Sequence, residues 1–224
     1  MNDVYKVYGE HKGDLVPLYA YQVNWSNPVS YDEKYLSKIR KKEKDNPISD
    51  KLNQYRVELV SKINPASLLD FGCGSRMFIR KYQKSKPHVR IYGYDLIPEI
   101  KKELVKFKQW LDPFSFHLAG NYLPLEVITF FDSLEHLINP SMVLLRIPPK
   151  GYVIVSIPIF DSLDDHYLSN HKHYRPNEHY WYFTHQGILS FFKTLGFQIV
   201  LCSNQESRIG RKDIFTYIFK RNEN

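Results

Sequence analysis

The sequence predicts an α/β protein with a seven-stranded, mainly parallel sheet, helices on both faces and an antiparallel C-terminal hairpin. Three observations support this fold class. Residues 68–79 read as a short apolar strand, a glycine turn and the start of an amphipathic helix, the unit that opens a ligand site in an open α/β sheet. Strand and helix patterns then alternate along the chain. A short connection containing Gly210 joins the last two strand patterns, which predicts a hairpin.

Two helices are expected ahead of the sheet. The first covers residues 31–44, and the second starts at Asn46-Pro47, where a capping residue precedes a proline, and ends at Asn64-Pro65. A later helix is expected between Thr184 as N-cap and Gly196 as C-cap. Further helices are expected through residues 78–82, from 98 to 107 and at 140–145. Strands are expected at residues 67–71, 89–94, 114–118, 127–131, 152–157, 197–202 and 213–219.

The chain is expected to form one main domain, residues 48–224, with an N-terminal extension. Residues 1–47 hold a tyrosine-rich stretch without clear periodicity and a helix. Because aromatic side chains are costly to expose, this aromatic arm is expected to lie on the body as a lid and not to form an independent domain. A second segment, residues 158–183, reads as a long polar and aromatic loop, and loops of that length are usually functional.

Composition narrows the class of protein. The 224 residues include two cysteines, Cys73 and Cys202, which do not make a disulfide framework and favour a reducing, cytoplasmic setting. No apolar run is long enough to span a bilayer, and the N-terminal residues lack an apolar signal segment, so we expect no membrane association. The formal net charge of +7 leaves a nucleic-acid partner open, although the basic residues are spread over several helix patterns and alternate with acidic ones.

The glycine turn identifies the kind of ligand. Asp70 precedes Gly72 and Gly74, and a carboxylate there would repel a pyrophosphate. The dinucleotide fingerprint also needs a third glycine where this chain has Met77. The stretch instead resembles the first motif of class I S-adenosylmethionine-dependent methyltransferases, an acidic residue followed by Gly-x-Gly-x-Gly. The third glycine of that motif falls at Arg76, whose side chain is expected either to crowd the carboxylate end of the cofactor or to bind it.

The resemblance extends over about residues 48–220 and implies a Rossmann-like fold. It includes Gly93-Tyr94-Asp95, the stretch from Phe131 to Leu137, the stretch from Gly151 to Pro158, and Gly196-Phe197. The Glu135-His136 pair after the fourth strand resembles the pattern in one branch of the family. That branch modifies small molecules and includes quinone-biosynthesis O-methyltransferases and sugar methyltransferases.

Cofactor-binding residues are expected at the ends of three strands. Asp95 ends the second strand, where a carboxylate can accept hydrogen bonds from ribose hydroxyls, and Leu96 with Ile97 would pack on the adenine. Asp70 would act near the cationic methionyl end of the cofactor. The remaining candidates are the turn residues Gly72, Cys73 and Gly74, then Phe131 and Asp132 with Phe130 beside them, where an aromatic face would suit a sulfonium.

Catalytic and acceptor-binding residues are expected in two places. His136 follows the fourth strand and could supply a general base. His173 and His179 are further catalytic candidates, because histidine can take a proton near neutral pH. With Arg175 they lie in the histidine-rich loop, which would overhang the site and contact a polar or anionic acceptor. A metal held by His171 and His173 with His179 or Asp165 is an alternative, but the spacing matches no standard zinc pattern, and no metal is expected.

These observations predict a methyltransferase that uses S-adenosyl-L-methionine to methylate oxygen or nitrogen of a small polar acceptor. The acceptor would lie under the N-terminal arm, with Tyr21 and Trp25 as lid residues, and under the 158–183 loop. Two other functions remain open. Arg76 in place of glycine motivates a cofactor-binding partner protein without catalysis, and the basic charge motivates an RNA methyltransferase, for which steep salt dependence of RNA binding is expected.

Overall fold

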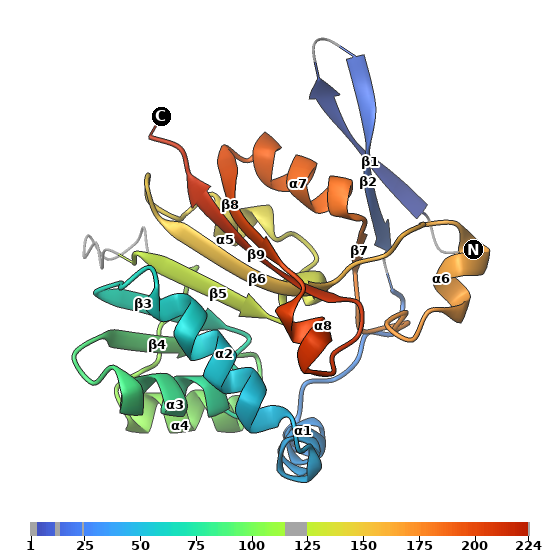
Figure 1. Ribbon diagram of the computed structural model, residues 1–224. Coiled ribbons are helices and arrows are strands. Elements are labelled where there is room, and N and C mark those ends of the chain that lie inside the picture. The colour runs from blue at the N-terminus through green and yellow to red at the C-terminus, as the bar shows by residue number, and fades with distance from the viewer. Residues whose placement is uncertain (1–3, 12–13, 24, 115–124, 224) are drawn as a thin grey trace.

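The computed structural model describes residues 4–11, 14–23, 25–114 and 125–223. Within these ranges two sheets and eight α-helices follow one another along the chain (Figure 1). The strands are β1 (Val4–His11), β2 (Asp14–Val23), β3 (Ser67–Phe71), β4 (Arg90–Tyr94), β5 (Val127–Phe131), β6 (Tyr152–Pro158), β7 (Trp181–Phe183), β8 (Phe197–Ser203) and β9 (Ile214–Arg221). The helices are α1 (Glu33–Asp45), α2 (Ser49–Ser61), α3 (Met77–Ser85), α4 (Pro98–Lys106), α5 (Ser141–Leu144), α6 (Asp165–Asn170), α7 (His185–Thr194) and α8 (Gln205–Ile209), with a 3-10 turn η1 (Leu134–His136).

The main sheet has the predicted mixed α/β topology. Its order is β4-β3-β5-β6-β9-β8, and β4, β3, β5 and β6 run parallel. The pairs β6–β9 and β8–β9 are antiparallel, which confirms the predicted C-terminal hairpin, although α8 occupies the connection between its strands. The sequence predicts a further strand at residues 114–118. Phe114 lies in a turn, and the rest of that segment falls outside the described residues.

Alternate residues of the central strands face two separate apolar layers. Leu69 and Phe130 belong to a cluster that includes residues of α5 and α7, whereas Leu68 and Phe131 belong to a cluster with residues of α1, α2, α3 and α4. Because side chains alternate across a strand, each face of the sheet needs its own cover of helices. The predicted helices on both faces are therefore confirmed.

The N-terminal arm differs from expectation. It is a β-hairpin, β1 with β2, and β2 pairs antiparallel with β7 to make a second, three-stranded sheet beside α7 (Figure 1). The segment 158–183 is likewise not a plain loop, because it contains α6 and β7. Strand β7 has only three residues and forms by pairing with a segment about 160 positions earlier in the chain, a non-local contact that its own sequence does not announce.

Helix ends agree with the sequence at one place and differ at another. Thr184 caps α7, since its hydroxyl oxygen accepts from the backbone N–H of Gly187 at 3.0 Å. Helix α2 starts at Ser49, later than the expected Asn46-Pro47 start, because the side chain of Asn46 accepts from the N–H of Ile48 in a turn before the helix. Among the described residues, no helix has the length and apolar character that crossing a membrane requires.

Candidate active site at the carboxyl edge of the sheet

Three parallel strands each have an acidic residue at or next to their carboxyl end, at the same edge of the sheet. Asp70 lies in β3, Asp95 follows β4 and Asp132 follows β5. A cavity of about 260 Å³ opens there, and a smaller hollow of about 120 Å³ adjoins it. Both are lined by Gly72, Gly74 and Asp132, so the two form one continuous site. Such an edge is where open α/β sheets bind their ligands.

The glycine turn is built by close approach of two backbones. Gly72 has φ +72° and Gly74 has φ +50°, a region that favours glycine. A Cβ at Gly72 would lie 2.5 Å from the Cβ of Ser133, whose hydroxyl donates to the carbonyl of Phe71 at 2.6 Å. The N–H groups of Gly72 and Cys73 both donate to the carbonyl of Tyr94, at 2.8 and 3.1 Å. The turn therefore needs glycine at position 72 for space as well as for conformation.

Asp95 is fixed against this turn. One carboxylate oxygen accepts from the N–H of Gly74 at 2.7 Å and the other from the N–H of Ile97 at 3.0 Å. Burial raises the pKa of Asp95, and these backbone hydrogen bonds oppose that rise. Each oxygen keeps a lone pair for a further donor. Leu96, 63% exposed, lines the same hollow and offers an apolar surface beside the carboxylate.

Arg76 neither crowds nor reaches the cavity, so both expectations for its side chain are wrong. Its guanidinium contacts the Glu103 carboxylate at 3.2 Å and the Gln109 side-chain oxygen at 2.7 Å, and it lies 4.6 Å from the centre of the Phe107 ring. The backbone of Arg76 has φ +66°, a conformation that suits the glycine implied at this position by the first-motif resemblance. The side chain points away from the turn toward α4, because Glu103 lies in that helix and Gln109 just after it.

Asp70 lies beneath the turn and is 3% exposed. The hydroxyl of Thr129 donates to its carboxylate at 2.7 Å. Burial raises the pKa of Asp70 to about 7, against the opposing effects of Thr129 and Arg56. A positive charge that enters the cavity would therefore favour the ionised form of Asp70.

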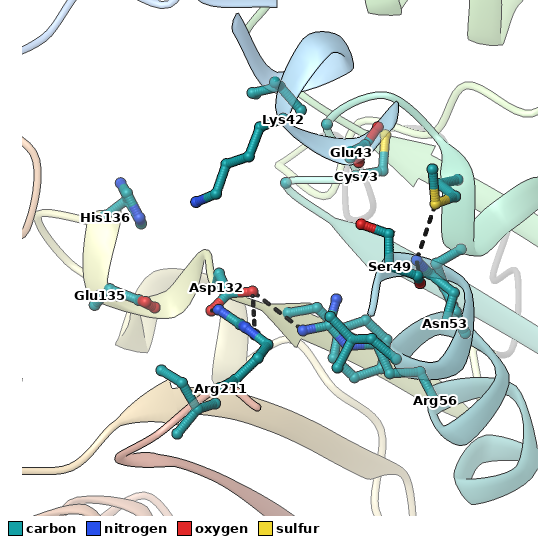
Figure 2. A pocket seen from close by; sticks show the side chains of 18 of the residues that line it. Lys42, Glu43, Ser49, Asn53, Arg56, Cys73, Asp132, Glu135, His136 and Arg211 are labelled. Carbon is teal, nitrogen blue, oxygen red and sulfur yellow. Dashed lines mark hydrogen bonds and ion pairs between the residues drawn. The ribbon is translucent and has the colours of Figure 1, made fainter. Parts of the chain in front are cut away.

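Asp132 belongs to a charge network that the sequence did not reveal. Arg211 donates to both Asp132 oxygens, at 2.6 and 2.9 Å, and Arg56 donates to one of them at 3.1 Å; Figure 2 marks both pairs. Both arginines also donate to Glu206, which is fully buried and accepts from Ser156 as well. Although burial alone would raise it, the two arginines hold the pKa of Asp132 well below its usual range. Two guanidinium groups therefore balance two carboxylates, of which Asp132 lines the cavity and Glu206 lies behind it.

The aromatic candidates at the end of β5 are not free to face a sulfonium. Phe130 is fully buried and packs in the apolar layer with α5 and α7. Phe131 lines the cavity, but the guanidinium of Arg56 lies 4.4 Å from the centre of its ring. The cation that contacts the Phe131 ring is thus the Arg56 guanidinium of the protein itself, in place of the expected sulfonium.

The structure brings two of the candidate histidines together. The rings of His136 and His179 lie 4.8 Å apart, and the hydroxyl of Tyr31 lies 2.8 Å from Nδ1 of His136. Glu135 is 1% exposed, and desolvation, together with the nearby Asp132 carboxylate, raises its pKa. Desolvation lowers the pKa values of both His136 and His179, so both imidazoles are neutral near pH 7.

The other acceptor-site candidates lie around this pair. His173 lines the cavity, and its Nε2 is 2.8 Å from the carbonyl of Lys212. Arg175 also lines it and pairs with Glu178 at 3.3 Å. Trp25 donates from its indole N–H to the carbonyl of His179 at 2.7 Å. Tyr21 lies in β2 opposite Tyr182, and its side chain is not among those the structure describes.

The sequence missed several residues of the cavity wall. Arg56 comes from α2 and Arg211 from the turn after α8, whereas Tyr31 precedes α1 and Tyr35 lies in it. Glu206 of α8 lies behind this wall and pairs with both arginines. No local motif marks them, because each becomes part of the site only through packing between distant segments. The one usable signal was charge: Arg56 lies on a helix pattern beside apolar residues that face the sheet.

Comparison with known proteins agrees with this architecture. Residues 40–201 match the family model described as a methyltransferase domain. The chain therefore belongs to the methyltransferase-domain family, and its fold is that of class I enzymes that use S-adenosyl-L-methionine. No functionally curated protein matches the sequence.

Solved structures share the fold at low sequence identity. Magnesium protoporphyrin IX methyltransferase from Synechocystis, with bound S-adenosylhomocysteine, is 13% identical with a TM-score of 0.58, over 86% of this chain and 96% of that one. The 1,6-didemethyltoxoflavin N1-methyltransferase of Burkholderia thailandensis, with 1,6-didemethyltoxoflavin and S-adenosylhomocysteine, is 14% identical with a TM-score of 0.54, over 91% and 96%. The N-methyltransferase NodS of Bradyrhizobium japonicum is 16% identical with a TM-score of 0.51, over 80% and 99%.

Proposed function

We propose that this protein transfers a methyl group from S-adenosyl-L-methionine to an oxygen or nitrogen atom of a small polar acceptor. The observation that carries the proposal is the convergence of Asp70, Asp95 and the glycine turn on one cavity that Arg76 leaves open. This is the arrangement that the first-motif resemblance predicts for an adenosyl-sulfonium cofactor. Similar structures solved with S-adenosylhomocysteine agree with it.

The two parts of the site suit the two ends of the cofactor. Asp95 would accept from the ribose hydroxyls, with Leu96 and Ile97 against the adenine, because these residues lie around the smaller hollow. Asp70, Gly72 and Cys73 lie around the larger cavity and would surround the methionyl end. The backbone oxygens and the Asp70 carboxyl provide acceptors for its ammonium group.

The acceptor would occupy the remaining space of the larger cavity. Its walls carry His136, His173, His179 and Arg175, and Trp25 fixes the backbone at His179. These groups suit a compact molecule with hydroxyl, amine or carboxylate groups. The arm bearing Tyr21 and the segment 158–183 would cover it together, since β2 and β7 pair.

Methyl transfer requires little from the protein beyond alignment of the acceptor atom with the methyl group. The sulfonium of the cofactor, when bound, supplies a methyl group on a good leaving group. Holding the acceptor atom in line with that methyl supplies much of the acceleration. The neutral imidazole of His136 can accept a proton from an acceptor hydroxyl or ammonium, so it is our candidate for the general base.

Cofactor binding gives the first test. We expect the change Asp95→Ala to weaken S-adenosylhomocysteine binding by about 10- to 100-fold, the range for losing hydrogen bonds to a charged group. Titration calorimetry measures it. Asp50→Asn, at an exposed ion pair on α2, is the matched control and should bind like the parent chain. Parent-like affinity in Asp95→Ala would contradict the ribose assignment.

Turnover decides between the proposal and its alternatives. Incubation with isotope-labelled S-adenosyl-L-methionine and a pool of small metabolites should transfer label to a small acceptor. Cofactor binding without transfer to any pool would support a non-catalytic partner protein, although the position of Arg76 removes the original motive for that function. Label transfer to RNA with steep salt dependence would support the RNA alternative. The cytoplasmic location remains a prediction, consistent with both cysteines being free.

A further inference from the structure

Three side chains at the acceptor end of the cavity form a compact set of possible metal ligands. They are Glu135, His136 and His179, and one ligand atom from each lies within 4.8 Å of the others. Glu135 and His136 belong to η1, whereas His179 comes from the segment just before β7. Two neighbouring histidine rings and a carboxylate from two separate segments therefore meet in the lining of one cavity.

Two of these side chains are buried with an atom that nothing satisfies. Oε2 of Glu135 and Nδ1 of His179 have no hydrogen-bond partner among the described residues, although the two residues are only 1% and 3% exposed. An unsatisfied buried polar atom costs about 1–3 kcal/mol. Two such atoms in one cluster indicate a binding site for an electron-pair acceptor, such as a metal ion, that contacts both atoms.

The surroundings hold the third ligand in position. Nδ1 of His136 lies 2.8 Å from the hydroxyl oxygen of Tyr31. When that nitrogen carries the proton and donates to Tyr31, Nε2 of His136 is left with a free lone pair. A hydrogen bond of this kind, on the nitrogen away from the metal, orients metal-binding histidines in general.

The neighbouring positive charges are already balanced. Arg211 pairs with Asp132 and Glu206, and Arg175 pairs with Glu178. A cation entering the cluster thus meets one buried carboxyl group and two imidazoles, beside guanidinium groups that each have an acidic partner.

We propose that Glu135, His136 and His179 bind a divalent first-row transition-metal ion such as Zn²⁺, Co²⁺ or Mn²⁺. Two imidazoles and one carboxylate suit these ions, whereas Mg²⁺ and Ca²⁺ prefer oxygen ligands alone. This trio differs from the His171 and His173 pair considered from the sequence. His171 lies 3.5 Å from Asp213, and His173 contacts the carbonyl of Lys212.

Three protein ligands leave coordination positions that can face the cavity. The role in catalysis rests on the proposed methyl transfer: a hydroxyl oxygen of the acceptor takes an open position, which lowers the pKa of that hydroxyl. Its O–H bond then breaks and the proton passes to solvent, because His136 as a metal ligand has no free lone pair and does not act as the general base. The oxygen's electron pair forms the bond to the methyl carbon, the carbon–sulfur bond breaks, and its electrons stay on sulfur to give S-adenosylhomocysteine. The site thus selects oxygen acceptors.

Metal binding is tested without cofactor or acceptor. The full chain is stripped with a chelator and titrated with Zn²⁺ by calorimetry and with Co²⁺ by visible absorption. One ion per chain is expected. Glu135→Gln and His179→Asn should each weaken Zn²⁺ binding by about 100-fold, as expected for loss of a direct ligand. Zn²⁺ affinity unchanged in both variants, or absence of stoichiometric binding, overturns the proposal.

Two control variants locate the site. His166→Asn replaces an exposed histidine on α6, and His173→Asn replaces a cavity histidine outside the trio. Both should keep parent Zn²⁺ affinity. Loss of binding in His173→Asn with parent affinity in His179→Asn would overturn the assignment in favour of the loop histidines.

A further measurement uses the parent chain, so its result does not depend on whether the variants fold. X-ray absorption of the zinc-loaded protein should show two imidazole nitrogens and oxygen ligands, without sulfur. A sulfur ligand would point to Cys73 or Cys202 and overturn the proposal. Metal binding is measured independently of the proposed methyl transfer. If the chain binds the metal but transfers no methyl group, the proposed function is contradicted and the metal site is not. If transfer to oxygen occurs, chelator treatment should abolish it while S-adenosylhomocysteine affinity stays within about threefold.

Discussion

Single backbone positions set the shape of the cofactor turn. Gly72 and Arg76 both have positive φ, but they differ in what surrounds them. Gly72 faces Ser133 so closely that no side chain fits, whereas the side chain of Arg76 has room to reach Glu103 and Gln109. Conformation alone therefore tolerates an arginine at the family's third glycine, while space does not tolerate any side chain at the first.

The contrast between two glycines tests this argument. Gly196 follows α7 with φ +81°, and apart from Gly196 and its two chain neighbours no atom of the described residues lies within 4 Å of the position that a Cβ would take there. A Cβ at Gly72 would meet Ser133 at 2.5 Å. We expect Gly196→Ala to lower the free energy of unfolding by about 1–2 kcal/mol, the cost of the left-handed conformation. Gly72→Ala should lose about 1–3 kcal/mol more from overpacking. Urea unfolding measures both. Because Ser133→Gly by itself removes the hydrogen bond to Phe71, the comparison is a double-mutant cycle: Gly72→Ala should cost less in the Ser133→Gly background than in the parent chain. Equal losses in the two single variants would argue against the clash.

Replacing the unusual arginine tests whether it touches the cofactor. Because its guanidinium lies toward α4, Arg76→Gly should leave S-adenosylhomocysteine affinity within about threefold of the parent value. Calorimetry checks this. An affinity gain of about tenfold or more would mean that the arginine does obstruct the cofactor in solution.

At the scale of elements, one buried charge network joins segments that are distant in sequence. Arg56 of α2, Asp132 after β5 and Glu206 of α8 meet through Arg211. The network closes the cavity wall on the side of the antiparallel hairpin. It also links α2, the helix that precedes β3, to α8 and the turn that leads into β9.

Breaking this network should be costly. Glu206→Gln leaves two guanidinium groups with one carboxylate in a buried setting, so we expect about 3–5 kcal/mol less stability. Arg208→Gln, an exposed change in the same short helix, should stay within about 0.5 kcal/mol. Denaturant unfolding compares the two, and similar midpoints would show that the network does not stabilise the fold.

At the scale of the whole molecule, burial of Asp70 links stability to pH. Its folded-state pKa of about 7 lies above the usual value of 3.8, so the folded protein holds this proton more tightly than the unfolded chain does. The contribution of Asp70 to stability is therefore fully present below pH 4 and is lost as pH rises to about 7.

The amide variant isolates that contribution. Asp70→Asn cannot ionise, so its stability relative to the parent chain should rise between about pH 4 and pH 7 and then level off. Unfolding curves for both proteins across this range measure the difference. A constant difference would show that Asp70 titrates with an ordinary pKa in the folded state.

Local sequence patterns were sufficient for the elements that fold from their own residues. The turn between Phe71 and Gly74, the parallel strands with their helices and the Thr184 cap have periods and residue types that neighbouring positions alone define. Asp95 could be placed at the turn because the carboxyl ends of adjacent parallel strands share an edge.

Only the tertiary structure decided the rest. Strand β7 exists because β2 pairs with it, Arg76 leaves the cavity because Glu103 and Gln109 lie elsewhere, and the charge network and the Glu135–His136–His179 cluster join residues from separate segments. By itself, the sequence determined the alternation of elements and the ligand-binding edge, since both follow from short-range periodicity and strand direction. The partners of each charged or histidine side chain depended on long-range packing, which no local pattern encodes.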